Sequence, residues 1–204
     1  MIDQNRYDKL IECISEAAGE PEAWPSVLHR LMSATDSPTS VLFRNAGAEI
    51  VEQYAVGWDP SFVPRLQKMQ VEDEWGKRRH GLPEGRAVLG TSLISHKRLR
   101  GTTFFQEFAK PAGITQMCAL LLFNTNSRFG SLSLFRPDDA APYGEEALYI
   151  ADTLAPYVRR SFVVSEKISS LTQRVSDLEK VLDRVMPGVL LLDRNGHVLY
   201  LNQS

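Results

Sequence analysis

Reactive side chains are few in this chain and lie far apart in the sequence. The two cysteines, Cys13 and Cys118, are too few for a disulfide framework or a thiolate metal cluster. The four histidines show no metal-ligand spacing; they are His29, His80, His96 and His197. The motifs of serine hydrolases, zinc proteases, P-loop proteins and dinucleotide-binding enzymes do not occur. Since an enzyme needs a convergent set of such groups, we expect no catalytic residue, no bound metal and no cofactor.

The aromatic and apolar side chains in the middle of the chain are better suited to holding a small molecule, because ligand pockets are mostly apolar with a few polar groups. Eight residues are candidates to line such a pocket: Tyr54, Trp58, Trp75, His80, Phe104, Phe105, Met117 and Phe135. Packing in the core is the alternative for each of them. Trp75 and His80 fall in residues 71–84, which have no hydrophobic period, and functional side chains tend to lie in loops. The basic run from Lys77 to His80 could face an anionic ligand or form a solvated loop.

Composition and charge are those of an ordinary globular protein. Hydrophobic residues make up 43% of the chain and charged residues 24%, and the net charge is −2. DNA-binding domains usually carry a basic surface, so we do not expect this chain to bind DNA itself. The N-terminus lacks the basic start and apolar core of a signal peptide, and no stretch has the ~20 apolar residues that cross a bilayer. We therefore expect a cytoplasmic protein without membrane contact, whose two cysteines are reduced and buried.

Hydrophobic periodicity predicts helices and strands in an order that favours an α+β domain. Helices are expected over residues 5–19, from Pro21 onward, from Asp59 onward and over 99–109. Strands are expected over 40–44, 50–57, 87–94, 116–123 and 129–135. In the last strand, alternation predicts one buried face and one wetter face. A central antiparallel sheet flanked by helices is the shape of small-molecule sensor domains of the GAF and PAS type, in which a ligand would lie between the sheet and the loop that covers it.

A long helix with a heptad repeat is predicted over residues 144–186. Its a positions are Leu154, Ser161, Ile168, Val175 and Leu182, and its d positions are Tyr157, Val164, Leu171, Leu178 and Val185. All but Ser161 are apolar, which is typical of a coiled coil. Arg174 at g and Glu179 at the next e attract each other between parallel strands. We predict a parallel homodimer joined through Val164, Ile168, Leu171, Val175, Leu178, Leu182 and Val185. The alternative is a helix packed on its own domain.

The pattern changes after Met186. Pro187 and Gly188 break the helix, and two short strands are expected over residues 189–192 and 198–201, joined by the turn Asp193-Arg194-Asn195-Gly196. A two-stranded piece is not stable alone, so we expect it to begin a further domain that is cut off at Ser204. The predicted organisation is a sensor domain over 1–160, a coiled-coil connector over 161–186 and the start of a PAS-like domain over 187–204.

Short segments spread over residues 50–204 match a known arrangement. The stretch 182–193, LDRVMPGVLLLD, with GHVLYLN at 196–202, is similar to the opening of a PAS-like segment. Further matching pieces are GWDP at 57–60, FFQEF at 104–108 followed by KPAGI, LSLFRP at 132–137, and YGEE at 143–146 followed by LAPYVRR at 154–160. In this order they resemble bacterial LuxR-type helix-turn-helix regulators that carry a sensor region, a helical connector, a PAS-like segment and a C-terminal DNA-binding domain.

The resemblance implies a role in transcription regulation. It makes this chain the sensing and dimerising portion, with a small-molecule ligand, and leaves DNA binding to a domain outside the chain. The ligand-pocket pattern of the acyl-homoserine-lactone receptors is not recognisable in the sequence. A domain without a ligand, which serves only for dimerisation or protein docking, is the alternative.

Overall fold

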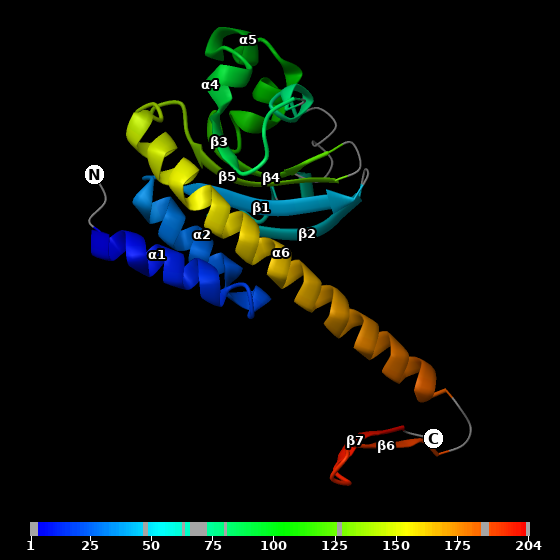
Figure 1. The fold of residues 1–204 in the computed structure, drawn as a ribbon. Helices are drawn as coiled ribbons and strands as arrows, with labels where there is room; N and C mark the ends of the chain where they lie inside the picture. Colours follow the sequence, from blue (N-terminus) through cyan, green and yellow to red (C-terminus); the bar gives the residue numbers. More distant parts are fainter. Residues whose placement is uncertain are drawn as a thin grey trace.

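The computed structural model describes residues 4–46, 49–62, 64–65, 73–79, 81–125, 128–184 and 188–202. One sheet contains the strands β1 (Thr39–Ala46), β2 (Glu49–Val56), β3 (Arg86–Leu89), β4 (Gln116–Asn124) and β5 (Arg128–Arg136). The helices are α1 (Gln4–Glu16), α2 (Trp24–Ala34), α4 (Gly90–Leu93), α5 (His96–Arg100) and α6 (Glu145–Leu182), with the short helical turns η1 (Pro21–Ala23), η2 (Gly76–Arg78) and η3 (Phe105–Ala109). A hairpin of β6 (Leu190–Leu192) and β7 (Val198–Leu201) follows α6 (Figure 1).

The five strands lie in the order β2-β1-β5-β4-β3, and each neighbouring pair is antiparallel. Helices α1, α2 and α6 cover one face of the sheet, whereas the segment that contains α4, α5 and η3 lies at the other (Figure 1). The predicted α+β fold, with a central antiparallel sheet flanked by helices and a long helix after it, is confirmed.

The face of the sheet under α1, α2 and α6 carries the larger core. Leu42, Leu120 and Leu132 point to this face and are fully buried, because every second side chain of a strand points the same way. The helices contribute apolar stripes with helical spacing: Trp24, Leu28, Leu31, Leu154, Val158 and Phe162. Both cysteines are buried in this core, as predicted.

The opposite face carries a second cluster that is rich in aromatic rings. Its buried members include Trp75, Phe104, Phe105, Phe108, Met117 and Phe135. Trp58 and Phe62 are partly buried beside it, and Trp58 stacks on Phe108 with ring centroids 6.4 Å apart. This second cluster lies where the sequence predicted a covered face of the sheet, and it contains most of the predicted pocket residues.

Two predicted elements are wrong in part. The strand expected over residues 87–94 ends at Leu89, and Gly90–Leu93 is a helical turn in which Ser92 Oγ donates a hydrogen bond to the Leu89 carbonyl. The helix expected over 99–109 is split into α5 and η3, because the turn at Gly101 ends α5. Of the helix expected after Asp59, residues 63 and 66–69 lie outside the described residues.

The first part of α6 belongs to the domain. Phe162 and Ser165 are fully buried, and the Glu166 carboxylate forms ion pairs with Arg44 on β1 and Arg128 on β5. Beyond Glu166 the helix projects away from the sheet (Figure 1). The seam residues Leu171, Val175 and Leu178 are 60%, 54% and 65% exposed, whereas Leu154 and Ser161 are buried against the domain.

The terminal hairpin contacts the end of α6. The Tyr200 hydroxyl donates hydrogen bonds to the Glu179 carbonyl and to Asp183 Oδ1, and the Asn202 amide donates to the Leu182 carbonyl. The two predicted strands are present, and their apolar side chains are exposed: Leu190, Leu191, Leu192, Val198, Leu199 and Leu201. None of the described helices is both long enough and apolar enough to cross a membrane.

Candidate ligand pocket

A cavity lies between the aromatic face of the sheet and the segment that covers it. The floor comes from all five strands of the sheet, and the cover comes from residues 73–79, the end of α4 and residues 104–114. The centre of a water molecule can occupy a volume of about 70 Å³ inside this cavity. A single ordered water needs only about 10–15 Å³ by the same measure, so the cavity has room for a larger guest.

The pairing of the strands explains why this cavity exists. Val41 on β1 pairs with Ser133 on β5, Ser133 pairs with Ala119 on β4, and Ala119 pairs with Val88 on β3. These four side chains are small and form one row across the floor. Larger side chains flank this row: Phe43 and Leu121 lie on either side of Ser131 in one neighbouring row, and Phe135 pairs with Met117 in the other. The small side chains of the central row, together with Ser131, leave a hollow in the sheet surface.

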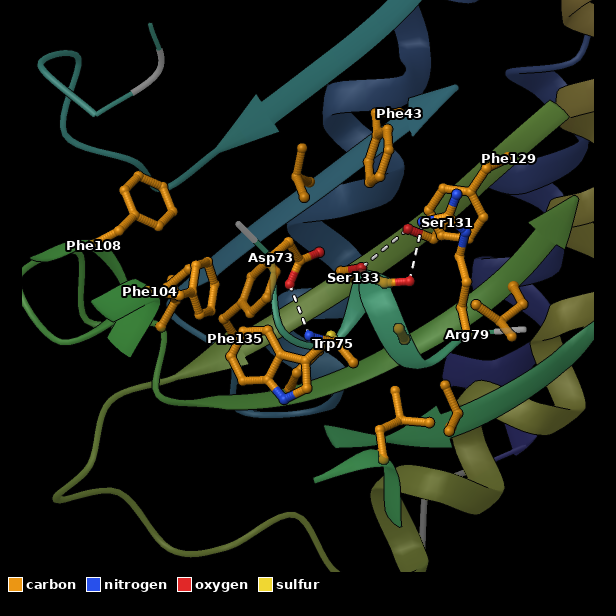
Figure 2. Close-up of a pocket in the computed structure, with 18 of the residues that line it drawn as sticks. Phe43, Asp73, Trp75, Arg79, Phe104, Phe108, Phe129, Ser131, Ser133 and Phe135 are labelled. Atoms are coloured by element: carbon orange, nitrogen blue, oxygen red, sulfur yellow. Dashed lines mark hydrogen bonds between the residues drawn. The ribbon is translucent and has the colours of Figure 1, made fainter. Parts of the chain in front are cut away.

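Aromatic rings build the cover of the cavity. Trp75 lies edge-on to Phe104, with ring centroids 5.5 Å apart, and 6.1 Å from Phe135 on the floor (Figure 2). Phe104 in turn contacts Phe108, with centroids 5.9 Å apart. Trp75 is 4% exposed. Because packed aromatic pairs have defined geometry, the cavity has a fixed wall where it meets η3.

A few polar groups point into this apolar space (Figure 2). The Asp73 carboxylate accepts a hydrogen bond of 3.0 Å from the Trp75 main-chain N–H. The hydroxyls of Ser131 and Ser133 lie 3.3 Å apart. The Arg79 guanidinium lies 4.0 Å from the centre of the Phe129 ring and donates to the Gly76 carbonyl. The Gln53 amide also lines the cavity, which therefore offers a carboxylate, an amide, a guanidinium and two hydroxyls to a ligand that is otherwise apolar.

The environment of Asp73 favours its neutral form. Burial of the carboxyl group raises its pKa above the ordinary value of 3.8, although N–H donors from Gly76 and Trp75 and the charge of Arg79 act in the opposite direction. The residue as a whole keeps some contact with solvent. Either protonation state of this carboxyl group can accept a hydrogen bond from a ligand N–H or O–H. The described residues contain no group of three His, Cys, Asp or Glu side chains that could hold a metal ion.

The structure brings together four of the eight predicted pocket residues: Trp75, Phe104, Met117 and Phe135 line the cavity. Trp58 and Phe105 pack behind them in the same cluster, and the Trp58 indole N–H donates to the Ser40 carbonyl. Tyr54 does not line the cavity, because it alternates with Gln53 and Ala55 on β2 and packs against the core under the helices. His80 lies outside the described residues.

Five polar lining residues were not among the predicted eight: Gln53, Asp73, Arg79, Ser131 and Ser133. The two serines did carry a signal, since they lie on the same face of β5 as Phe129 and Phe135 and alternate with Gly130, Leu132 and Leu134. The prediction that one face of this strand is wetter is wrong, because the residues of both faces are buried from Phe129 to Arg136. Of the described part of the basic run, residues 77–79, Lys77 and Arg78 pair with Glu74, and Arg79 lines the cavity. The paired residues are not free to meet an anionic ligand.

Replacing Asp73 by asparagine should change how stability depends on pH. A raised pKa in the folded protein means that the folded state holds the proton more tightly, so the carboxyl costs stability as the pH rises above 3.8. Asparagine cannot ionise, so the stability of Asp73→Asn relative to the unmodified protein should improve between about pH 4 and pH 7. Urea unfolding over this range measures the difference. Asp59→Asn is the control of opposite sign, because hydrogen bonds from Ser61 lower the pKa of exposed Asp59. A difference for Asp73→Asn that falls as the pH rises would contradict this assignment.

Comparison with known proteins identifies the fold. No family model and no curated protein sequence matches the chain. The solved ligand-binding domain of VqsR from Pseudomonas aeruginosa superposes with a TM-score of 0.63 and 13% identity, over 79% of this chain and 97% of that one. CepR2 from Burkholderia cenocepacia, an N-acylhomoserine-lactone-dependent LuxR-family transcription factor, gives a TM-score of 0.56 and 15% identity, over 77% and 91%. Escherichia coli SdiA in complex with octanoyl-rac-glycerol gives 0.51 and 16%, over 83% and 69%.

At these identities the likeness concerns the fold. The chain has the fold of the ligand-binding domains of LuxR-family regulators, so the predicted resemblance is confirmed at that level. This likeness includes acyl-homoserine-lactone-dependent proteins, whose pocket pattern the sequence alone did not display.

Proposed function

We propose that this chain is the signal-sensing and dimerising part of a LuxR-type transcriptional regulator. The ligand is a small uncharged amphipathic molecule that occupies the cavity between the sheet and its aromatic cover. The DNA-binding helix-turn-helix lies in another part of the protein, outside this chain. The projecting half of α6 joins two copies as a parallel coiled coil.

The observation that carries the proposal is the hollow floor of the sheet beneath a cover built around the rings of Trp75, Phe104 and Phe108. A domain that serves only for dimerisation has no need of a row of small residues in the middle of its sheet, because close packing stabilises a core. The polar groups at the cavity, which include Asp73, Ser131 and Ser133, match a ligand head group with both donors and acceptors. Octanoyl-rac-glycerol, which binds SdiA, and the acyl-homoserine lactones on which CepR2 depends have this combination of apolar chain and polar head.

Ligand binding is tested by thermal unfolding with two probes, octanoyl-rac-glycerol and an eight-carbon acyl-homoserine lactone. A ligand at about 100 times its Kd stabilises the folded state by about 2.7 kcal/mol, which raises Tm by roughly 5–10 °C for a chain of this size. Ala119→Leu should abolish the shift, because the larger side chain fills the floor. Ala18→Leu, which adds the same atoms near the end of α1 on the other side of the sheet, should retain it.

The alternative is a module that has lost its ligand and serves only for dimerisation or protein docking. It predicts that neither probe changes Tm and that native mass spectrometry finds no bound small molecule in the purified protein. Both results together would contradict the sensing part of the proposal. Equal shifts in the unmodified protein and in Ala119→Leu would mean that the probes bind outside the cavity.

A further inference from the structure

Exposed apolar side chains of the sensor domain are gathered on one helix. Among the described residues before Glu166, the exposed large apolar side chains are those of Tyr149, Tyr157 and Val164, and all three belong to α6. Tyr149 is 70% exposed and Tyr157 is 43% exposed. Single apolar side chains on a surface need no explanation, but a group of them that lies together marks an interaction site.

These residues lie on the same side of α6 as the proposed coiled-coil seam. Tyr149 and Tyr157 are eight residues apart, and steps of seven residues lead from Tyr157 to Val164, Leu171 and Leu178. Two turns of an α-helix take 7.2 residues, so these five exposed side chains form one row along the helix, the α6 stripe. The stripe therefore continues from the projecting half of α6 onto the sensor domain.

The opposite side of this part of α6 faces its own domain. Leu154 and Val158 are fully buried in the core between the helices and the sheet. Helix α1 contacts α6 as well, and it carries half-buried Tyr7. Burial and the nearby Tyr157 and Tyr149 raise the pKa of the Tyr7 phenol, so the three tyrosines lie close together. Two helices therefore contribute to one aromatic patch on the side of the domain that faces away from the sheet.

The projecting part of α6 is short for a coiled coil that works alone. Between Ile168 and Leu182 it contains two heptads, whereas the pattern typical of a coiled coil extends over about three to four. Its five seam side chains bury roughly 60–120 Å² each, which together is less than the ~800 Å² that each partner of a stable interface buries. Two tyrosines add about 150–250 Å² each when they are buried, so the stripe on the sensor domain supplies the area that the seam lacks.

We propose that the α6 stripe is an interface between two copies of this chain along its whole length, so that the sensor domains pack against each other as well as the projecting helices. The inference deepens the dimer of the proposed function and rests on it. A parallel two-fold arrangement brings equivalent residues together, so Tyr149, Tyr157 and Val164 of one copy face the same residues of the second. Tyr7 lies at the edge of this contact. Arg160 occupies a flanking g position, where a charged side chain is typical.

This arrangement leaves the ligand cavities uncovered. Helices α1, α2 and α6 lie on one face of the sheet, and the cavity lies on the other (Figure 1). The contact between the two copies is therefore on the side of each sensor domain that is away from its cavity. A dimer joined only through the projecting helices would instead leave the tyrosines of the stripe in water.

Arginine at either tyrosine should weaken the dimer. Tyr149→Arg and Tyr157→Arg each remove a ring from the contact and place two like charges opposite each other, so we expect the dissociation constant to rise at least about tenfold. Sedimentation equilibrium of the full chain at several concentrations measures this constant. Tyr157→Phe keeps the ring and should leave it unchanged. Thr91→Arg is the control, because Thr91 is exposed on α4, at the other face of the sheet (Figure 1).

Tyr157→Cys provides a second measurement that adds no charge. Equivalent d residues face each other across the axis of a parallel pair, so mild oxidation of Tyr157→Cys should give a disulfide-linked dimer. Thr91→Cys should remain unlinked under the same conditions, and both native cysteines are buried. If circular dichroism shows that an arginine variant is unfolded, this cross-linking result decides.

The outcomes separate this interface from the dimer itself. A chain that is monomeric before any substitution would contradict the proposed dimer and this interface with it. A dimer that Leu178→Asp dissociates, but that neither arginine variant weakens, would retain the proposed function and overturn this inference, because the sensor domains would then be held apart. Equal weakening by Thr91→Arg would also overturn it, since added charge would then act without regard to position.

Discussion

Replacing Trp24 by alanine should lower the free energy of unfolding by about 3–5 kcal/mol, the range for removal of a fully buried tryptophan. Trp24 is 0% exposed and lies edge-on to Phe162 of α6, with ring centroids 5.4 Å apart. Its indole N–H donates to Ser165 Oγ at 3.2 Å. The side chain therefore joins α2 to α6 at the last buried turn before the long helix leaves the domain. Such a loss is a large part of the stability of an ordinary domain, about 5–15 kcal/mol.

Trp24→Phe is the matched control. It keeps an aromatic ring against Phe162 but removes the N–H, so it should cost clearly less than the alanine variant. Urea unfolding followed by circular dichroism at 222 nm measures both at one protein concentration. The assignment of Trp24 as the main anchor of α6 fails if Trp24→Ala costs less than about 1 kcal/mol, the usual cost of a point mutation.

The elements that the sequence predicted well are those with a strong local pattern. The alternation of residues 129–135 and the apolar run of 116–123 were enough to place β5 and β4 to within a residue at each end. The long helix was marked by its repeat, and its observed bounds, Glu145–Leu182, lie inside the prediction. The strand expected at 87–94 failed because Gly90 and the Ser92 hydroxyl favour a turn over an extended chain.

The cavity was harder to predict because it depends on how distant strands pair. Val41, Ala119 and Ser133 are unremarkable in the sequence, and they form a hollow row only after three strands are set in register. Both faces of the sheet are apolar, so alternation alone could not tell which face of β2 lines the cavity. This is why Tyr54 was selected and its neighbour Gln53 was not. Asp73 lies in a segment with no hydrophobic period and gave no local signal.

The sequence pattern of α6 also could not show which part of the helix packs on its own domain. Its heptad repeat runs through both halves of the helix, but the two halves use it differently. Leu154 packs into the domain core and is 0% exposed. Leu178 is also at a seam position of the heptad repeat, but it is 65% exposed. The alternative prediction, a helix packed on its own domain, therefore describes the part of α6 before Glu166. The coiled-coil prediction concerns the part after Glu166. Of the predicted seam, Val164 and Ile168 lie at the transition, Leu182 is partly buried, and Val185 lies outside the described residues.

Leu171→Asp and Leu178→Asp should each convert the dimer that we propose into monomers. A dimer contains two copies of each seam leucine, and full burial of one leucine contributes about 1.5–3 kcal/mol. Losing two such contributions, with a carboxylate placed in the seam instead, weakens association by at least about a hundredfold, at 1.4 kcal/mol for each factor of ten. Sedimentation equilibrium of the unmodified protein and the variants measures the change directly.

Ser170→Asp is the control, because it adds the same charge next to Leu171 at an exposed position off the seam. It should leave the dimer intact, and circular dichroism should show that all three variants remain folded. Leu178→Cys tests the orientation, since the two copies of this residue face each other across the axis of a parallel coiled coil. Under mild oxidation it should form a disulfide-linked dimer, while the native cysteines are buried and remain unlinked. If both aspartate variants stay dimeric at the same concentration as the unmodified protein, the exposed half of α6 is not the interface.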